Sequence, residues 1–167
     1  MNYFLLKWIY YILQILMNYK GEKMIEQDTI KLMRECDAGI KMGISSIEDV
    51  LEYVNDEELK DLLKNSKTEH ERLKEDVEKL LIECGDDGKE PNPVAKGMAW
   101  MKTNVKLVMN ESDTTIADLI TDGCDMGVKS LNKYLNQYKA ASEEVKDLAK
   151  KIIKTEECLE KGMQKFL

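Results

Sequence analysis

The chain has 167 residues, 34% of them charged, and a formal net charge of −7. With only two prolines and nine glycines, this composition favours a single helical domain over a sheet protein. The negative charge and the lack of a lysine- or arginine-rich stretch argue against a nucleic-acid surface. The four cysteines have no CxxC spacing, which argues against a zinc knuckle or a thioredoxin-type pair. We expect reduced thiols in a cytoplasmic protein.

Residues 1–23 are apolar and aromatic, unlike the rest of the chain, and two interpretations of them stay open. Lys7 interrupts a run that is already short for a transmembrane helix, and a signal-peptide cleavage pattern is missing, so this segment could act only as a weak membrane anchor. Alternatively, the codons for Tyr19–Lys23 can spell a purine-rich ribosome-binding sequence just before Met24. Translation would then begin at Met24, and residues 24–167 would be the whole folded domain.

The first hairpin is predicted from apolar residues that alternate spacings of three and four. Its first helix covers about Glu26–Val54, with Asp37 on the apolar stripe. A tight break at Asn55-Asp56 leads into the second helix, which ends near Cys84 and carries His70 on its stripe. A connection this short predicts two antiparallel neighbours.

The connection between the hairpins contains the turn-rich stretch Gly85–Pro93. It is followed by a shorter amphipathic pattern over Val94–Val108 that includes Trp100. We interpret this segment as the crossover that returns the chain to the starting end of the bundle, and Trp100 as a packing anchor.

The second hairpin follows the same plan as the first. Ser112-Asp113 is expected to cap a helix over about Thr114–Tyr138, and Ala140–Ser142 forms the second tight break. The last helix covers about Glu143–Phe166, and Glu156 lies on its apolar stripe.

An internal repeat supports two copies of one hairpin. EELKDLLK at Glu57–Lys64 returns as EEVKDLAK at Glu143–Lys150, and CDAGIK at Cys36–Lys41 resembles CDMGVK at Cys124–Lys129. The repeated segments cover both helices of each predicted hairpin. The sequence therefore predicts an all-α four-helix bundle made of two duplicated antiparallel hairpins.

Two hairpins joined by a long crossover resemble the ferritin-like four-helix bundle. The stretch PNPVAKGMAWMKTNVKLVMNESDTTIADL, with its tryptophan-bearing helix before the third long helix, is similar to uncharacterised bacterial ferritin-like bundles. The resemblance implies a ferritin-like fold over residues 24–167. Di-iron members of the superfamily use Glu-x-x-His motifs, whereas the single histidine here, His70, follows Lys67 at that spacing.

Four polar residues on the apolar stripes predict one layer: Asp37, His70, Asp125 and Glu156. Counted from the two tight breaks they lie at matching heights, and the repeat pairs His70 with Glu156. Because an isolated buried carboxylate costs several kcal/mol, three alternatives stay open. The layer is an internal hydrogen-bonded network, or it binds iron, manganese or zinc, or it is misplaced by one residue and Cys124 faces inward instead of Asp125.

For function, we expect a non-enzymatic helical bundle that acts through protein contacts, with a homodimer as one such contact and no nucleic acid or membrane partner unless residues 1–23 are a real anchor. The alternative is a metal-binding or redox protein with a degenerate ferritin-like site built on the four-residue layer. No cofactor is expected apart from Fe, Mn or Zn in that alternative.

Overall fold

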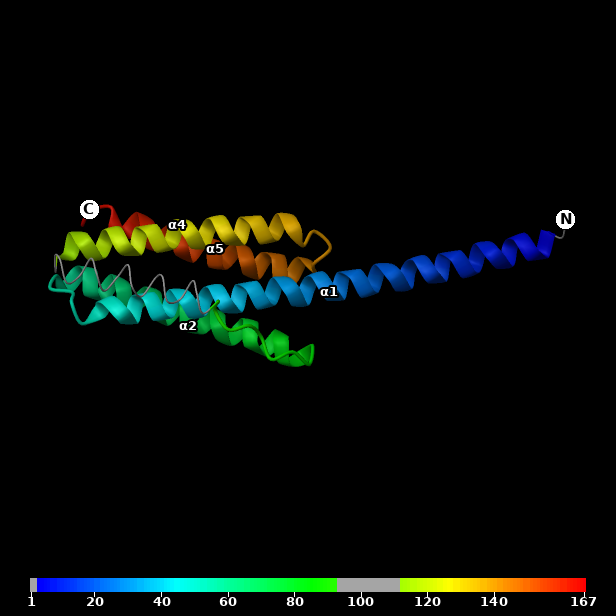
Figure 1. Cartoon of the computed structure of the whole chain (residues 1–167), viewed down its shortest axis with the longest axis horizontal. Coiled ribbons are helices and arrows are strands. Elements are labelled where there is room, and N and C mark those ends of the chain that lie inside the picture. The colour runs from blue at the N-terminus through cyan, green and yellow to red at the C-terminus, as the bar shows by residue number, and fades with distance from the viewer. Residues whose placement is uncertain (1–2, 93–111) are drawn as a thin grey trace.

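The computed structural model describes residues 3–92 and 112–167, and this part of the chain contains helices and no strands (Figure 1). Four helices are present in it: α1 over Tyr3–Leu51, α2 over Glu57–Glu83, α4 over Asp113–Gln137 and α5 over Glu143–Met163. The prediction of an all-helical bundle is confirmed for the described residues. The expected crossover helix over Val94–Val108 and its Trp100 lie outside them.

The starts of α2 and α5 lie where the sequence predicts them, because two repeat-equivalent side chains cap them. The Asp56 carboxylate accepts hydrogen bonds from the N–H groups of Glu58 and Leu59 at 2.8 and 3.0 Å. Ser142 Oγ accepts one from the N–H of Val145 at 3.4 Å. Each cap satisfies N–H groups that have no partner within the first helical turn.

The first helix differs most from its prediction, since α1 begins at Tyr3 instead of Glu26 and runs for 49 residues. No proline interrupts it, and one internal glycine such as Gly21 weakens a helix without breaking it. Its N-terminal part extends beyond the other helices (Figure 1). There, large apolar side chains between Ile9 and Met24 are 42–73% exposed. Within the described residues, no helix has the length and apolar character needed to cross a membrane.

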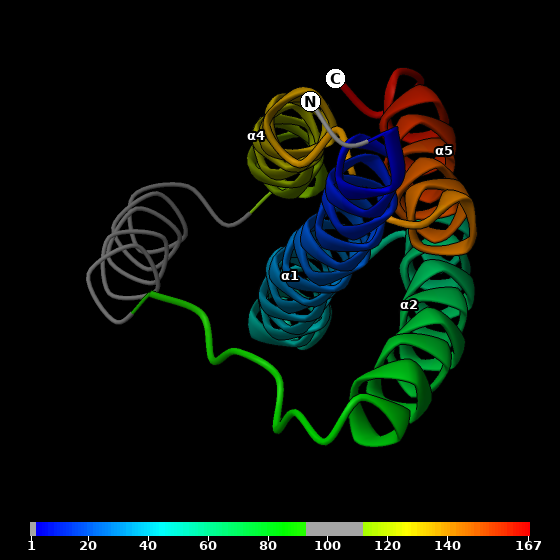
Figure 2. The same cartoon turned by 90° about the vertical axis from the view of Figure 1, so that its right-hand side faces the viewer.

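The two hairpins point in opposite directions. The N–H groups of Asn55 and Asp56 donate to the Asp113 carboxylate at 2.9 and 3.1 Å, so α4 begins beside the α1–α2 turn. At the other end of the bundle, the N–H of Ser142 donates to Thr29 Oγ1 at 2.9 Å, which places the α4–α5 turn against α1. Consequently α2 and α4 run in the same direction, and α1 lies next to α4 while α2 lies next to α5 (Figures 1 and 2).

Buried apolar side chains form two clusters. One includes Leu32, Leu73 and Ile152, and the other includes Leu63 and Leu159. Along α2 and α5, buried polar residues fall between the two clusters. The core is thus interrupted near the middle of the bundle, and that interruption is where the polar stripe positions meet.

Candidate functional site

The centre of the bundle contains a buried pair made by His70 on α2 and Glu156 on α5. His70 is 0% exposed and Glu156 is 7% exposed. His70 Nε2 lies 3.1 Å from Glu156 Oε1, and His70 Nδ1 lies 2.8 Å from the backbone carbonyl oxygen of Ser66. Both ring nitrogens of His70 therefore face an oxygen.

These contacts favour one charge state of the His70–Glu156 pair. A backbone carbonyl only accepts hydrogen bonds, so His70 Nδ1 carries a hydrogen. Burial lowers the pKa of His70, but the hydrogen bond and the charge of Glu156, together with the Ser66 carbonyl, outweigh burial and raise that pKa. The raised pKa favours an imidazolium that donates from Nε2 to Glu156 Oε1.

Cys124 on α4 lies against the same carboxylate and is 2% exposed. Burial, followed by the charge of Glu156 and a hydrogen bond to it, raises the pKa of the Cys124 thiol far above its ordinary value. Burial likewise raises the pKa of Cys36 to about 12. Both groups stay as thiols at neutral pH, and Cys124 serves as a weak S–H donor to Glu156.

Two glycines form the walls that face the pair. A Cβ atom on Gly43 of α1 would lie 3.2 Å from His70 Nε2 and 3.5 Å from Glu156 Oε1. A Cβ atom on Gly127 of α4 would lie 3.4 Å from the same Oε1. The absence of side chains at these positions leaves the Glu156 carboxylate room between α1 and α4.

The pair lies at the floor of a cavity of about 360 Å³ between α1 and α4. The two walls carry several small residues, among them Ala38, Gly39 and Gly123, and methionines Met42 and Met126 line it as well. Lys89, Pro91 and Asn92, from the segment after α2, also contribute to the lining. A mostly apolar hollow of this size with a few convergent polar groups is typical of small-molecule sites.

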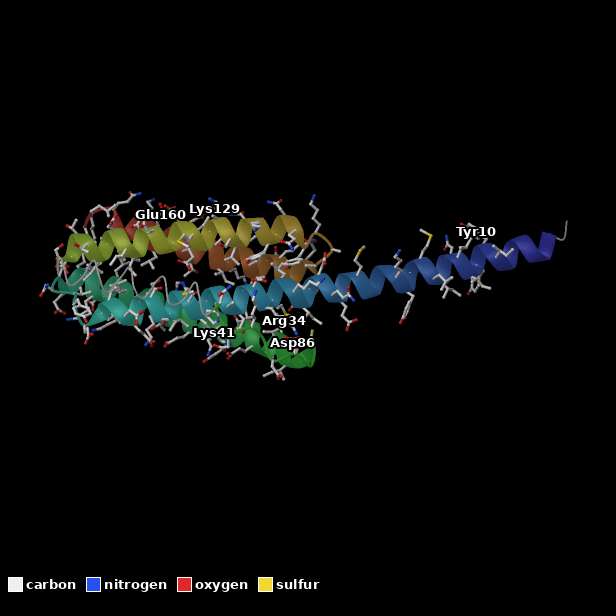
Figure 3. All side chains as sticks on the ribbon, viewed as in Figure 1. Tyr10, Arg34, Lys41, Asp86, Lys129 and Glu160 are labelled. Atoms are coloured by element: carbon white, nitrogen blue, oxygen red, sulfur yellow. The ribbon has the colours of Figure 1, made fainter. Side chains whose placement is uncertain are left out.

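The segment after α2 is held against α1 by ion pairs (Figure 3). Arg34 donates two hydrogen bonds to the Asp86 carboxylate, at 2.9 and 2.5 Å, and Lys89 Nζ lies 2.6 Å from Glu35 Oε1. Lys41 Nζ pairs with Glu90 at 2.8 Å. We call residues 86–90 the strap, because they bond to side chains of α1 between Arg34 and Lys41 and contribute Lys89 to the cavity lining.

Asp37 hydrogen-bonds to the strap and not to the central His70–Glu156 pair. It is 0% exposed, and its Oδ2 accepts hydrogen bonds from the backbone N–H of Lys89 at 2.8 Å and from Lys41 Nζ at 3.0 Å. Gly88, at φ 79°, passes directly over it, where a Cβ would come within 2.4 Å of Oδ2. The Asp37 Oδ1 atom is buried and has no hydrogen-bond partner among the described residues.

Asp125 is exposed, and the inward position is taken by Cys124, as in the third alternative drawn from the sequence. One helical residue rotates a side chain by about 100°, so a one-residue error moves a group from the core to the surface. The structure thus brings His70 and Glu156 together and places Asp37 and Asp125 elsewhere.

The opposite direction of the hairpins explains why one layer does not form. Asp37 lies 18 residues before the first turn and Asp125 lies 16 before the second, and these turns are at opposite ends of the bundle. At about 1.5 Å per residue, the two aspartates therefore lie on opposite sides of the midpoint. His70 and Glu156, each 15 residues after a turn, both lie near that midpoint and meet.

No group of three or more His, Cys, Asp or Glu side chains in residues 3–92 and 112–167 is arranged to hold a metal ion. His70 would have to release Glu156 or the Ser66 carbonyl before either of its nitrogens could act as a ligand. Of the arrangements drawn from the sequence, the hydrogen-bonded pair is the one that these contacts support.

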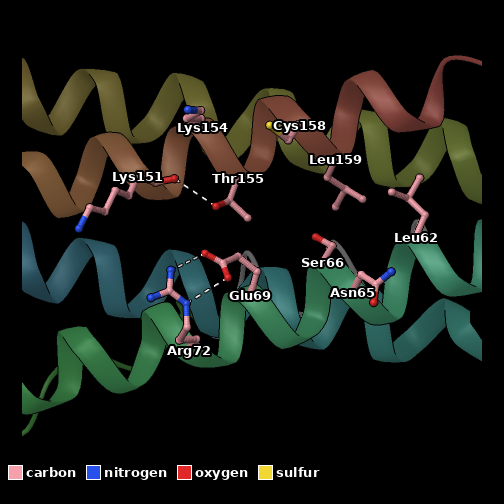
Figure 4. Close-up of a pocket in the computed structure, with 10 residues that line it drawn as sticks. All are labelled: Leu62, Asn65, Ser66, Glu69, Arg72, Lys151, Lys154, Thr155, Cys158 and Leu159. Atoms are coloured by element: carbon pink, nitrogen blue, oxygen red, sulfur yellow. Dashed lines mark hydrogen bonds and ion pairs between the residues drawn. The ribbon is translucent and has the colours of Figure 1, made fainter.

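A second hollow, of about 380 Å³, lies between α2 and α5 (Figure 4). It is lined by exposed polar side chains, including Arg72, which pairs with Glu69 at 2.6 Å, and Lys151. Ser66, whose backbone carbonyl contacts His70 Nδ1, also lines this hollow. This hollow carries no buried charged group, so we take the α1–α4 cavity as the candidate site.

The sequence singled out His70 and Glu156 but missed Gly43. Gly43 lies four residues after Gly39, on the same side of α1, and that spacing was the available signal. Comparison with known proteins finds no matching family model, no matching curated protein and no matching solved structure.

Proposed function

We propose that the protein is a non-enzymatic helical bundle of ferritin-like topology that binds a small organic molecule in the α1–α4 cavity. The parallel direction of α2 and α4, which begin at the same end of the bundle, supports the ferritin-like topology and its two duplicated hairpins. The fold itself carries no function, so the proposal rests on the site.

One observation carries the binding function: a charge-balanced polar pair lies at the floor of an otherwise largely apolar cavity. Catalysis finds little support there. Both ring nitrogens of His70 already contact an oxygen, so neither is open to act as a base. Cys124 is held as a thiol and is not an activated nucleophile.

The binding function is tested with 2-naphthol as a fluorescent probe of the purified full chain. Gly39 lines the cavity, and a Cβ there meets nothing within 4 Å, so Gly39→Leu adds a side chain to the cavity wall at an uncrowded position. We expect saturable 2-naphthol binding to the wild type and at least about a tenfold loss, or about 1.4 kcal/mol, in Gly39→Leu.

The matched control is Gly21→Leu, which makes the same change on α1 outside the cavity, where a Cβ also meets nothing. It should bind 2-naphthol like the wild type. An equal affinity in Gly39→Leu and Gly21→Leu, with both variants folded by circular dichroism, would show that the cavity is not the binding site.

A second candidate function, contact with another copy of the chain, is favoured by the exposed apolar residues of the α1 extension. Tyr10 and Met17 are 64% and 73% exposed there, and Figure 3 shows Tyr10 on this extension. Contiguous exposed apolar surface marks an interaction site. In a two-fold dimer, the α1 extensions of two chains would bury these exposed apolar side chains against each other. Light scattering after size-exclusion chromatography should give a dimer for the full chain and a monomer for residues 24–167.

A further inference from the structure

The charged side chains that line the α1–α4 cavity cancel one another. Only four lining residues carry charge in the described part of the chain: Glu35, His70, Lys89 and Glu156. They form two pairs, His70 with Glu156 at 3.1 Å and Lys89 with Glu35 at 2.6 Å. An ionised ligand would therefore bring an uncompensated charge into an apolar hollow, which is strongly unfavourable.

The floor of the cavity still offers hydrogen-bond acceptor capacity. The Glu156 carboxylate receives the Nε2–H of His70 and the weak S–H of Cys124. An ionised carboxylate has about four lone-pair positions, so it can accept a further hydrogen bond. A donor on the ligand satisfies this capacity, whereas a second acceptor is repelled by it.

The space for that donor lies between the two glycines. Glu156 Oε1 is 3.5 Å from the Cβ position of Gly43 and 3.4 Å from that of Gly127, so it lies between the α1 and α4 backbones. A ligand group that enters between these helices reaches the carboxylate without meeting a side chain from either glycine.

Most of the remaining lining is apolar and suits a hydrocarbon body. It includes Met42, Ile47, Leu119, Ile120, Leu131 and Ile152. Removing an apolar ligand from water into such surroundings is favourable in proportion to the area that it buries.

Building on the proposed binding function, we propose that the ligand is a neutral, largely apolar alcohol or phenol whose hydroxyl donates to Glu156 between Gly43 and Gly127. Its hydroxyl joins His70 and Cys124 as a third donor to one carboxylate, and its body fills the apolar part of the cavity. Glycines 43 and 127 then determine specificity, because they keep that donor position open.

The test compares four probes of one shape on the full chain at pH 7: 2-naphthol, 2-methoxynaphthalene, 2-naphthoate and 2-naphthylmethylamine, which is protonated at this pH. We expect 2-naphthol to bind at least about tenfold tighter than 2-methoxynaphthalene, which lacks the donor. Both charged probes should bind more weakly than 2-naphthol.

Two variants examine the donor position. Gly127→Ala places a methyl group beside Glu156 Oε1, and the preference for 2-naphthol over 2-methoxynaphthalene should fall below about threefold. Gly21→Ala, outside the cavity and at a position where a Cβ meets nothing within 4 Å, should keep the full preference. Glu156→Gln retains an acceptor for His70 Nε2–H. It should also lower the preference for 2-naphthol over 2-methoxynaphthalene, since an amide oxygen is a weaker acceptor than a carboxylate.

Equal affinity of the wild type for 2-naphthol and 2-methoxynaphthalene would overturn the proposed ligand class while leaving the cavity as a binding site. Tighter binding of either charged probe would overturn the class as well. If neither neutral probe binds the folded wild type, the proposed binding function itself fails.

Discussion

At the scale of single residues, the two hydrogen bonds of His70 determine what the centre of the bundle can do. Its Nδ1 is held by the Ser66 carbonyl on its own helix, while its Nε2 bridges to Glu156 on α5. A buried ion pair of this kind is costly to break, because the partner left behind is an uncompensated charge. The pair is therefore sensitive to pH and to substitution.

The pH dependence follows from the raised pKa of His70. A group whose pKa is higher in the folded state contributes stability that is fully present below its unfolded value, about 6.5, and is lost as the pH rises through the folded pKa. His70→Gln should therefore be less stable than the wild type by about 1–3 kcal/mol at pH 5.5, and the difference should shrink at alkaline pH. Urea unfolding of both proteins between pH 5.5 and 9 measures it, and a constant difference across that range would contradict the ion pair.

Metal addition gives a separate prediction. Because His70 has both nitrogens engaged, we expect Fe(II), Mn(II) and Zn(II) to leave the Tm of the wild type unchanged. Elemental analysis after aerobic and anaerobic purification provides the second measurement. Stoichiometric metal in the wild type that is missing from His70→Gln would instead favour the metal-binding alternative.

At the scale of elements, the strap gives repeat-equivalent residues different surroundings. Asp37 and Asp125 occupy corresponding places in CDAGIK and CDMGVK. Asp37 is buried beneath residues 86–90, where it accepts the N–H of Lys89, whereas Asp125 is exposed. The environment of Asp37 is thus set by a segment that comes much later in the chain than Asp37 itself.

Alanine substitutions at these two positions form a matched pair. Asp37→Ala removes the acceptor for Lys89 N–H and for Lys41 and should lower the free energy of unfolding by about 1–3 kcal/mol. Asp125→Ala should change it by less than about 0.5 kcal/mol. Guanidinium unfolding of both variants would contradict the assignment of the strap if the two substitutions cost the same.

The sequence predicted the bounds of α2, α4 and α5 well because their signals are local. Asp56 and Ser142 cap their own helices, and the three-and-four spacing depends only on residues within a helix. The four-residue layer depended on how the hairpins lie relative to each other, which no local pattern contains. The prediction that Asp125 faces inward failed for a simpler reason. Cys124 is its neighbour in the sequence, and the apolar spacing fits an inward side chain at either position.

At the scale of the whole molecule, α1 extends well beyond the other helices (Figure 1). Among the described side chains of α1, the first that hydrogen-bond to another element are Asp28 and Thr29, which accept the N–H groups of Ala140 and Ser142 at 3.1 and 2.9 Å. Among the described residues before them, large apolar side chains remain exposed. The folded core therefore begins close to the residue at which translation from Met24 would start the chain.

Deleting residues 1–23 should accordingly change the stability of the bundle by less than about 1 kcal/mol when measured at a low protein concentration that keeps the full chain monomeric. Urea unfolding of residues 24–167 against the full chain measures this difference. A large loss would mean that the extension packs on the bundle. Intact-mass measurement of the native protein decides independently whether residues 1–23 are present.

Because the two hairpins point in opposite directions, repeat-equivalent positions meet at the His70–Glu156 contact. Positions 70 and 156 correspond in the repeat and face each other at the midpoint. Two identical, unlinked hairpins in this arrangement would place the same residue on both sides, which means two histidines or two carboxylates, and like charges repel. Because both hairpins lie on one chain, the two positions can differ, and an acid can face a base where they meet.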